Sequence, residues 1–127
     1  MSAPFILKLD EQVKKLTPIV LWEGDTNDTD NNVVLSDDIS NYKKIKIYFH
    51  DNDQQYGSQE IYNNNANEIR VSLFSLFNSG EYFNVKMVSK NIIGNRIYGI
   101  GQGNFDFNNK STYFDNSIYF TRVEGYK

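Results

Sequence analysis

The feature that most constrains the fold is an alternation of apolar and polar residues that continues through the chain after Pro18. It is clearest in residues 44–50, where Ile45, Ile47 and Phe49 alternate with polar or amphipathic residues. An alternation with period two places the two sets of side chains on opposite faces of a β-strand, so that one face is buried and the other faces water. Later segments repeat the pattern at residues 68–73, 82–87 and 117–121, with shorter apolar runs at 19–22 and 33–35.

Short polar stretches lie between these segments. They are rich in Asn, Asp, Gly and Ser, and the longest are residues 24–32, 50–60 and 108–117. Such residues are typical of turns because their side chains bond to nearby backbone groups or permit unusual backbone angles. About seven short strands separated in this way, with no helix between them, predict an all-β fold, an antiparallel β-sandwich that is jelly-roll-like.

Residues 96–107 read as a strand with one bare face. Gly99, Gly101 and Gly103 recur at every second position, so one face of this strand carries no side chains. Such a face is typical of a bulge, or of a place where another backbone or an aromatic ring approaches closely.

The first segment, residues 2–17, has a helical period. Its apolar positions alternate spacings of three and four residues, as in a heptad repeat: Ile6, Leu9, Val13 and Leu16. Pro18 disfavours helical geometry at the residue before it, so the helix should end there. The chain is therefore predicted to have a short N-terminal α-helix, residues 1–17, and a β-sandwich head, residues 18–127. A lone helix of this length is marginal in water, so its apolar stripe either packs on its own domain or gathers copies of the chain.

Composition excludes several classes of function. With 13 Lys and Arg against 16 Asp and Glu, the net charge is -3, which argues against a nucleic-acid partner because such binding depends on clustered cations. The absence of cysteine excludes disulfides, Cys-based zinc sites and thiol nucleophiles. No apolar run is long enough to cross a bilayer, and the first residues do not read as a signal peptide, so we expect neither membrane insertion nor export by the general route.

The acidic stretch at residues 24–32, GDTNDTDNN, resembles a calcium-binding loop at first sight. An EF-hand loop needs glycine at its sixth position and glutamate at its twelfth. Counted from Asp25 or from Asp28, neither position has the required residue. We therefore favour a solvated hairpin tip, with a calcium site of another kind as the alternative, and predict no metal and no cofactor.

Catalysis is not favoured by the residues present. His50, the single histidine, falls at a strand end on the polar face, with no neighbouring nucleophile motif, and is expected to be a surface residue. A glycosidase needs only two suitably spaced carboxylates. The candidates by residue type are Asp37, Asp38, Glu60, Asp106 and Asp115. Asp37 and Asp38 are adjacent and more typical of a turn, so we predict no catalytic residue and no enzyme.

Exposed tyrosines are the more informative feature. If the apolar set of each strand faces inward, the tyrosines that alternate with it face outward. A tyrosine offers a flat apolar ring with a polar tip, which suits stacking on a sugar or packing at a protein interface. The alternative is that these aromatics simply pack well on a pleated sheet. The candidate ligand-binding residues are Trp22, Tyr48, Tyr82, Tyr98 and Tyr119.

Two segments carry a resemblance to a known class of protein. Residues 21–24, LWEG, are followed after a polar loop by VLSDDISNYKKIKIYF at residues 34–49, and residues 121–127 read TRVEGYK. These patterns resemble a module of tail-fibre, baseplate and receptor-binding proteins of bacteriophages, especially those that infect Gram-positive hosts. The resemblance covers residues 19–50 and 117–127 and is weak between them.

The matched positions have structural reasons rather than binding roles. They are Trp22, Gly24, Leu35, Ser36, Asp37, Asn41, Tyr42 and Gly125. Gly24 is expected to turn the chain, Leu35 to fill the core, and Tyr42 to anchor the following strand. The loop at residues 24–32 is more acidic than the loop of the pattern.

The resemblance implies a virion structural protein of tail-fibre or baseplate type, made in the host cytoplasm and displayed on the phage particle. It implies a homo-oligomer, often a trimer, gathered by the N-terminal helix; the heptads alone would favour two strands. Implied partners are copies of itself, other virion proteins and host-surface polysaccharide, bound through many weak sites. Two alternatives stay open: a decoration or connector protein of the virion without glycan binding, and a monomeric bacterial carbohydrate-binding module.

Overall fold

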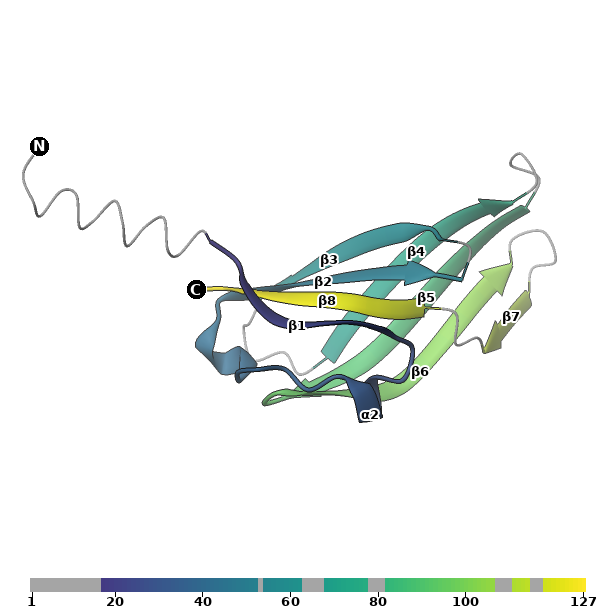
Figure 1. Ribbon diagram of the computed structural model, residues 1–127. Coiled ribbons are helices and arrows are strands. Elements are labelled where there is room, and N and C mark those ends of the chain that lie inside the picture. The colour runs from purple at the N-terminus through teal and green to yellow at the C-terminus, as the bar shows by residue number, and fades with distance from the viewer. Residues whose placement is uncertain (1–16, 53, 63–67, 78–81, 107–110, 115–117) are drawn as a thin grey trace, which may run out of the picture.

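The computed structural model describes residues 17–52, 54–62, 68–77, 82–106, 111–114 and 118–127 (Figure 1). Within them the chain forms eight β-strands in two antiparallel sheets of four strands each. The first sheet contains β1 (Ile19–Thr26), β2 (Lys44–Asp51), β3 (Tyr56–Tyr62) and β8 (Ile118–Tyr126). The second contains β4 (Glu68–Phe77), β5 (Tyr82–Ile93), β6 (Arg96–Asp106) and β7 (Ser111–Phe114). The prediction of an all-β antiparallel fold is confirmed.

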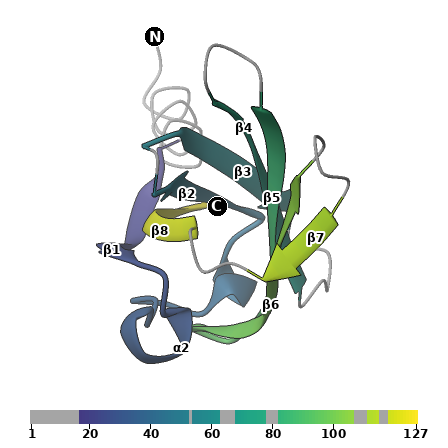
Figure 2. The same ribbon diagram turned by 90° about the vertical axis from the view of Figure 1, so that its right-hand side faces the viewer.

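The strand order explains how the two layers are joined. The first sheet has the order β1-β8-β2-β3, and the second is a simple meander, β4-β5-β6-β7. In Figure 2 the first sheet lies on the left and the second on the right. A jelly roll is built from two Greek keys. Here four consecutive strands stay in one sheet, so the observed order differs from the jelly-roll part of the prediction.

The core lies between the two sheets. The alternation in β2 buries Ile45, Ile47 and Phe49, as predicted, and they meet Ile69 and Val71 of β4 from the opposite layer. Other strands add further buried side chains: Leu21, Leu73, Val88, Ile92, Ile97, Ile118, Phe120 and Val123. Full burial of one such large apolar side chain stabilises a fold by about 1.5–3 kcal/mol. The period-two pattern in the sequence therefore reports the core correctly in β2, β4 and β8. In β5 it is wrong, because Met87 is 53% exposed and the buried residues are Lys86 and Val88.

Two strands were not predicted. β3 begins inside the polar stretch at residues 50–60 and continues to Tyr62, and β7 lies within residues 108–117; both stretches read as turns in the sequence. Each is an edge strand, paired on one side only, β3 with β2 and β7 with β6. Edge strands are commonly polar, and their pairing with a neighbour outweighs a weak local preference.

The acidic stretch at residues 24–32 is not a hairpin tip. β1 pairs with β8 rather than with the segment that follows it. A single helical turn, α2 (Thr29–Asn32), comes next, and the carboxylate of Asp28 accepts a hydrogen bond from the Asn31 N–H at its start. The chain then crosses to the second sheet, where the Leu35 N–H donates to the Asn95 carbonyl at 2.8 Å. Burial of Val33 and Leu35 explains this path, because both side chains close the side of the core.

Four further expectations can be compared with the structure. Leu35 fills the core, as expected, and Tyr42, which was expected to anchor the following strand, is buried. Gly24 does not turn the chain: it lies within β1, where a side chain would meet the Trp22 ring at 2.5 Å. The glycine-rich strand carries the expected bulge, because the register shifts where Ser89 pairs with Gly101 and Lys90 pairs with Gly99.

The predicted N-terminal helix falls on residues that the structure does not describe. Ile6, Leu9, Val13 and Leu16 lie outside the described ranges, so the oligomerising helix stays a prediction. None of the helices in the described part of the chain is long and apolar enough to span a membrane.

Candidate binding face

The outer surface of the first sheet is formed by the side chains of β2 that alternate with its buried residues, together with their neighbours on β8 and β3. The strand register sets out four rows across these three strands: Tyr126, Lys44 and Tyr62; Glu124, Lys46 and Glu60; Arg122, Tyr48 and Ser58; Tyr119, His50 and Tyr56. We call this surface the tyrosine face. Aromatic and charged residues alternate along it, and each row brings together residues that are far apart in the chain.

At one end of the tyrosine face a lysine lies between two rings. The Nζ of Lys44 is 4.5 Å from the centroid of the Tyr126 ring and 5.9 Å from that of Tyr62. It also forms an ion pair with Glu60 at 3.3 Å. Cation–π contacts of this kind hold a ring and a cation together without hiding the ring from solvent. Tyr62 is 64% exposed and keeps its ring open to a partner.

In the middle of the face, Tyr48 is held by its polar tip. A hydrogen bond with the buried Glu124 carboxylate, together with burial, raises the pKa of the Tyr48 hydroxyl. Lys46 lies over the ring, 5.0 Å from its centroid, and its hydrogen bond with Tyr48 raises the pKa of Lys46. Arg122 bridges Glu23 and Glu124. The cations of this face are therefore paired with nearby carboxylates and aromatic rings. This pairing leaves little net positive charge to attract an anion.

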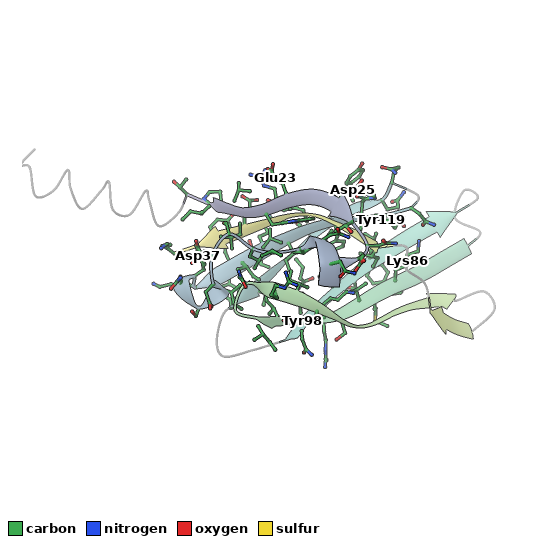
Figure 3. All side chains as sticks on the ribbon, turned by 60° about the horizontal axis from the view of Figure 1, so that its bottom comes forward. Glu23, Asp25, Asp37, Lys86, Tyr98 and Tyr119 are labelled. Atoms are coloured by element: carbon green, nitrogen blue, oxygen red, sulfur yellow. The ribbon has the colours of Figure 1, made fainter. Side chains whose placement is uncertain are left out.

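The other end of the face is built around His50, which is not the surface residue predicted from the sequence. Its side chain is only 7% exposed. The imidazole stacks on Tyr119, with centroids 5.2 Å apart and planes 3° from parallel, and Tyr56 lies on its other neighbour strand at 5.4 Å. The rings that cover His50 come from β8 and β3. The residues next to His50 in the sequence therefore could not predict its burial. Asp25, near the end of β1, contacts the imidazole as well, and Figure 3 shows it on the same side of the molecule as Tyr119.

Both ring nitrogens of His50 face oxygen atoms. Nδ1 lies 2.6 Å from the backbone carbonyl of Asp51, and Nε2 lies 2.8 Å from Oδ1 of Asp25. Only the imidazolium donates from both nitrogens at once. Burial by itself lowers the pKa of His50, but the hydrogen bonds with Asp51 and Asp25, and the negative charges of these residues, outweigh burial and raise this pKa.

This geometry predicts a pH-dependent contribution to stability. Because the pKa of His50 is raised in the folded chain, its contribution is fully present below pH about 6.5, the ordinary value, and is lost as the pH rises through the raised pKa. NMR of the single imidazole in the chain measures this pKa directly. Asp25→Asn should lower the pKa of His50. Glu23→Gln should not, because Glu23 is an exposed residue of the same strand whose carboxylate pairs with Arg122 instead. A wild-type pKa at or below 6.5, or one unmoved by Asp25→Asn, would contradict the assignment.

Directly inside this end of the face lies a buried ion pair. Lys86 of β5 points into the space between the sheets (Figure 3), where its Nζ is 3.3 Å from Oδ2 of Asp51 and 3.1 Å from Oδ1 of Asn52. Asp51 is fully buried, and Lys86 is 3% exposed. The other Asp51 oxygen accepts a hydrogen bond from the Gln55 N–H. The pair links the two sheets at the point where β2 ends.

The residues predicted to bind ligand do not all come together. Tyr48 and Tyr119 share the tyrosine face. Tyr98 is 41% exposed on the outer surface of the second sheet, and Figure 3 shows it on the side opposite Glu23 and Asp25. Tyr82 begins β5, and its side chain is outside the described part of the structure. Trp22 packs partly against the core, with its indole N–H donating to the Asn32 carbonyl.

Sequence reasoning missed Tyr56, Tyr62 and Tyr126 on the tyrosine face. Tyr56 and Tyr62 are the first and last residues of β3, a strand that was not predicted from the sequence. Both side chains are highly exposed. A signal was available: residues 56, 58, 60 and 62 alternate with Gly57, Gln59 and Ile61, and Tyr126 shares its face with Glu124. It is weak because only one residue of the β3 inner set is a large apolar one.

The carboxylates named as catalytic candidates are dispersed. Asp38 caps the short turn Ile39–Asn41, and Asp37 accepts a hydrogen bond from the Tyr42 hydroxyl at 2.9 Å. Glu60 pairs with Lys44, Asp106 ends β6, and Asp115 lies outside the described residues. Across the described ranges, no group of three or more His, Cys, Asp or Glu residues is arranged to hold a metal ion. In the acidic stretch, Asp25 bonds His50 and Asp28 caps α2.

Comparison with known proteins adds no relative: no profile of a known protein family matches the chain, and no curated protein matches it either.

Proposed function

We propose that this chain is a non-catalytic structural protein of a bacteriophage virion, of tail-fibre or baseplate type. Its β-sandwich head, residues 18–127, would bind host-surface polysaccharide through the tyrosine face. The observation that supports binding is the gathering of five tyrosines on one face of one sheet: Tyr48, Tyr56, Tyr62, Tyr119 and Tyr126. The virion assignment rests on the sequence resemblance at residues 19–50 and 117–127.

The arrangement suits a sugar chain better than a charged ligand. Tyr126 and Tyr62 flank Lys44 from strands two positions apart, a separation of about 10 Å at the usual strand spacing. Tyr119 and Tyr56 flank His50 in the same way. Flat rings at these intervals can stack on successive parts of a polysaccharide. Between the rings, carboxylates can accept hydrogen bonds from sugar hydroxyls, and tyrosine hydroxyls can donate or accept them.

Weak single sites would act together on the particle. A helix at residues 1–17 would gather copies of the chain, most simply as a trimer, and other virion proteins would fix the assembly. Linking identical weak sites on one rigid body raises the overall avidity by 10²–10⁴ without any new contact, as an order of magnitude. The proposed location is the surface of the phage particle.

The test removes exposed rings on one face and compares them with a ring on the other. Tyr56→Ala and Tyr62→Ala should each lower affinity for host cell-wall polysaccharide about tenfold, since a stacked ring contributes roughly 0.5–1.5 kcal/mol beyond its buried area. These tyrosines are 70% and 64% exposed, so the fold should tolerate their loss. Tyr98→Ala, on the second sheet, is the matched control. Calorimetry with purified polysaccharide measures the affinities.

Three results would count against this function. One is equal weakening by Tyr98→Ala, which would mean that the loss of affinity is not specific to the tyrosine face. Another is the absence of wild-type binding to any polysaccharide of a glycan array. The third is cleavage of the sugar chain, which would make the protein an enzyme.

A second candidate is a decoration or connector protein of the virion that does not bind glycan. The outer surface of the second sheet favours it, because large apolar side chains are exposed there at Phe74, Met87 and Tyr98. Exposed apolar patches commonly mark protein interfaces. The absence of binding to any glycan of the array, together with assembly of the protein onto particles, would support this candidate. A monomer in sedimentation that still binds sugar would instead support a bacterial carbohydrate-binding module.

A further inference from the structure

Lys86 is a primary amine held between the two sheets, next to a carboxylate and a carboxamide. Its Nζ lies 3.1 Å from Oδ1 of Asn52 and 3.3 Å from Oδ2 of Asp51. Lys86 and Asp51 are both buried, while Asn52 is exposed at the rim of the site. The tyrosine face does not use this group, because it lies on the inner side of the first sheet.

We propose that Lys86 and Asn52 join through a side-chain amide bond, with Asp51 moving the protons. Nζ of Lys86 would become bonded to Cγ of Asn52, and the carboxamide nitrogen of Asn52 would leave as ammonia. The carbon lies one carbonyl bond, about 1.2 Å, beyond the oxygen that Nζ already contacts. Rotation about the side-chain bonds of Asn52 therefore brings Cγ within the roughly 3–3.5 Å at which such groups react.

The steps balance without a co-reactant. The Lys86 ammonium gives one proton to the Asp51 carboxylate, which leaves a neutral amine with a free electron pair. This amine attacks Cγ of Asn52 while the Asp51 carboxylic acid donates a hydrogen bond to the carbonyl oxygen. Asp51 then passes its proton to the departing nitrogen and takes up the surplus proton of the attacking nitrogen, which it gives to the released ammonia, so that Asp51 ends as a carboxylate and the ammonia leaves as ammonium. The bond from Cγ to the amide nitrogen breaks, one ammonia forms, and nothing is oxidised or reduced.

The surroundings favour each step. Lys86 and Asp51 are both buried and in direct contact, so the proton passes between them without reaching solvent. The Gln55 N–H holds one Asp51 oxygen at 2.9 Å, so the other oxygen stays directed at the amine. Asn52 is exposed, so ammonia departs into solvent and its dilution prevents the reverse reaction.

The bond would tie the two layers of the sandwich together. Asn52 follows β2 in the first sheet, and Lys86 lies in β5 of the second, 34 residues away. A covalent link across such a span restricts the unfolded chain and resists separation of the sheets. It would form in a single polypeptide without cysteine or metal.

The decisive measurement is the intact mass of the purified full-length chain after incubation at neutral pH. The proposal expects a mass lower by one ammonia than the sequence requires. Trypsin should then release a branched peptide with two N-termini, in which residues 47–70 are joined to residues 71–90 because the modified Lys86 resists cleavage. Fragmentation should place the join between Asn52 and Lys86.

Variants separate this bond from other losses of mass. Lys86→Arg, Asn52→Ala and Asp51→Asn should keep the full mass, whereas Lys90→Arg, on the same strand, should lose ammonia like the wild type. Asn52 can also lose ammonia by cyclising on its own backbone, without any need for Lys86. Retention of the loss in Lys86→Arg would therefore overturn the proposal. So would an unchanged wild-type mass, or loss of one water, which would place the bond at Asp51.

Discussion

Phe49→Ala should lower the free energy of unfolding by about 3–5 kcal/mol, the usual cost of deleting a buried phenyl ring. Phe49 is 1% exposed at the end of β2, between Tyr48 and His50, so its ring supports the tyrosine face from the inside. Phe49 pairs with Gly57 on one side and Phe120 on the other, and Gly57 has no side chain that could fill the space. Urea denaturation followed by tryptophan fluorescence measures the loss.

Gly57 supplies the control for this prediction. A side chain at residue 57 would meet the Phe49 ring at 2.9 Å, so Gly57→Ala should destabilise the wild-type chain. In the Phe49→Ala background only the Leu73 side chain stays close, with Cδ1 at 3.3 Å, so the same change should cost less than in the wild-type chain. A double-mutant cycle expresses this as a coupling energy between the two positions. Additive costs would show that the ring and residue 57 do not compete for the same space.

The sequence predicts this fold where strands are half buried. The alternation in residues 44–50 assigns every inward residue of β2 correctly, because burial of one face makes the pattern strict. The same reasoning does not predict β3 and β7. They are edge strands with polar residues on both faces, so the alternation of apolar and polar residues in them is weak. The helical turn α2 after β1 is not predicted either. The path of the chain there depends on burial of Val33 and Leu35 against a sheet that is distant in the sequence.

The candidate site is less predictable than the fold because it depends on strand register. Alternation identifies Tyr48 as an outward residue, but it does not say which residues lie beside it. His50 meets Asp25 across 25 positions of sequence, and Lys86 meets Asp51 across 35. The β8 strand, inserted between β1 and β2, creates the aromatic stack of Tyr119 on His50. The order of strands in the first sheet brings Asp25 and Tyr119 to His50, and the packing of the second sheet against the first brings Lys86 to Asp51.

The matched segments at the two ends of the chain meet at Tyr42 and Gly125. A side chain at residue 125 would lie 2.5 Å from Cδ1 of the Tyr42 ring, so only glycine lets the ring pack flat on β8. Tyr42 is buried, and its hydroxyl donates to Asp37 at 2.9 Å. This contact gives both positions a structural reason, whatever the protein binds.

Gly125→Val should therefore lower the free energy of unfolding by about 3 kcal/mol, at the upper end of the usual cost of overpacking a core. Displacement of the ring should also break the hydrogen bond that, more than any other contact, holds the pKa of Asp37 below its ordinary value. NMR titration of the Asp37 carboxyl reports this, and its pKa should return toward the ordinary range in the variant. Tyr42→Ala removes the obstacle, so Gly125→Val should cost much less in that background. An equal cost with and without the ring would mean that β8 needs glycine at residue 125 for its backbone rather than for Tyr42.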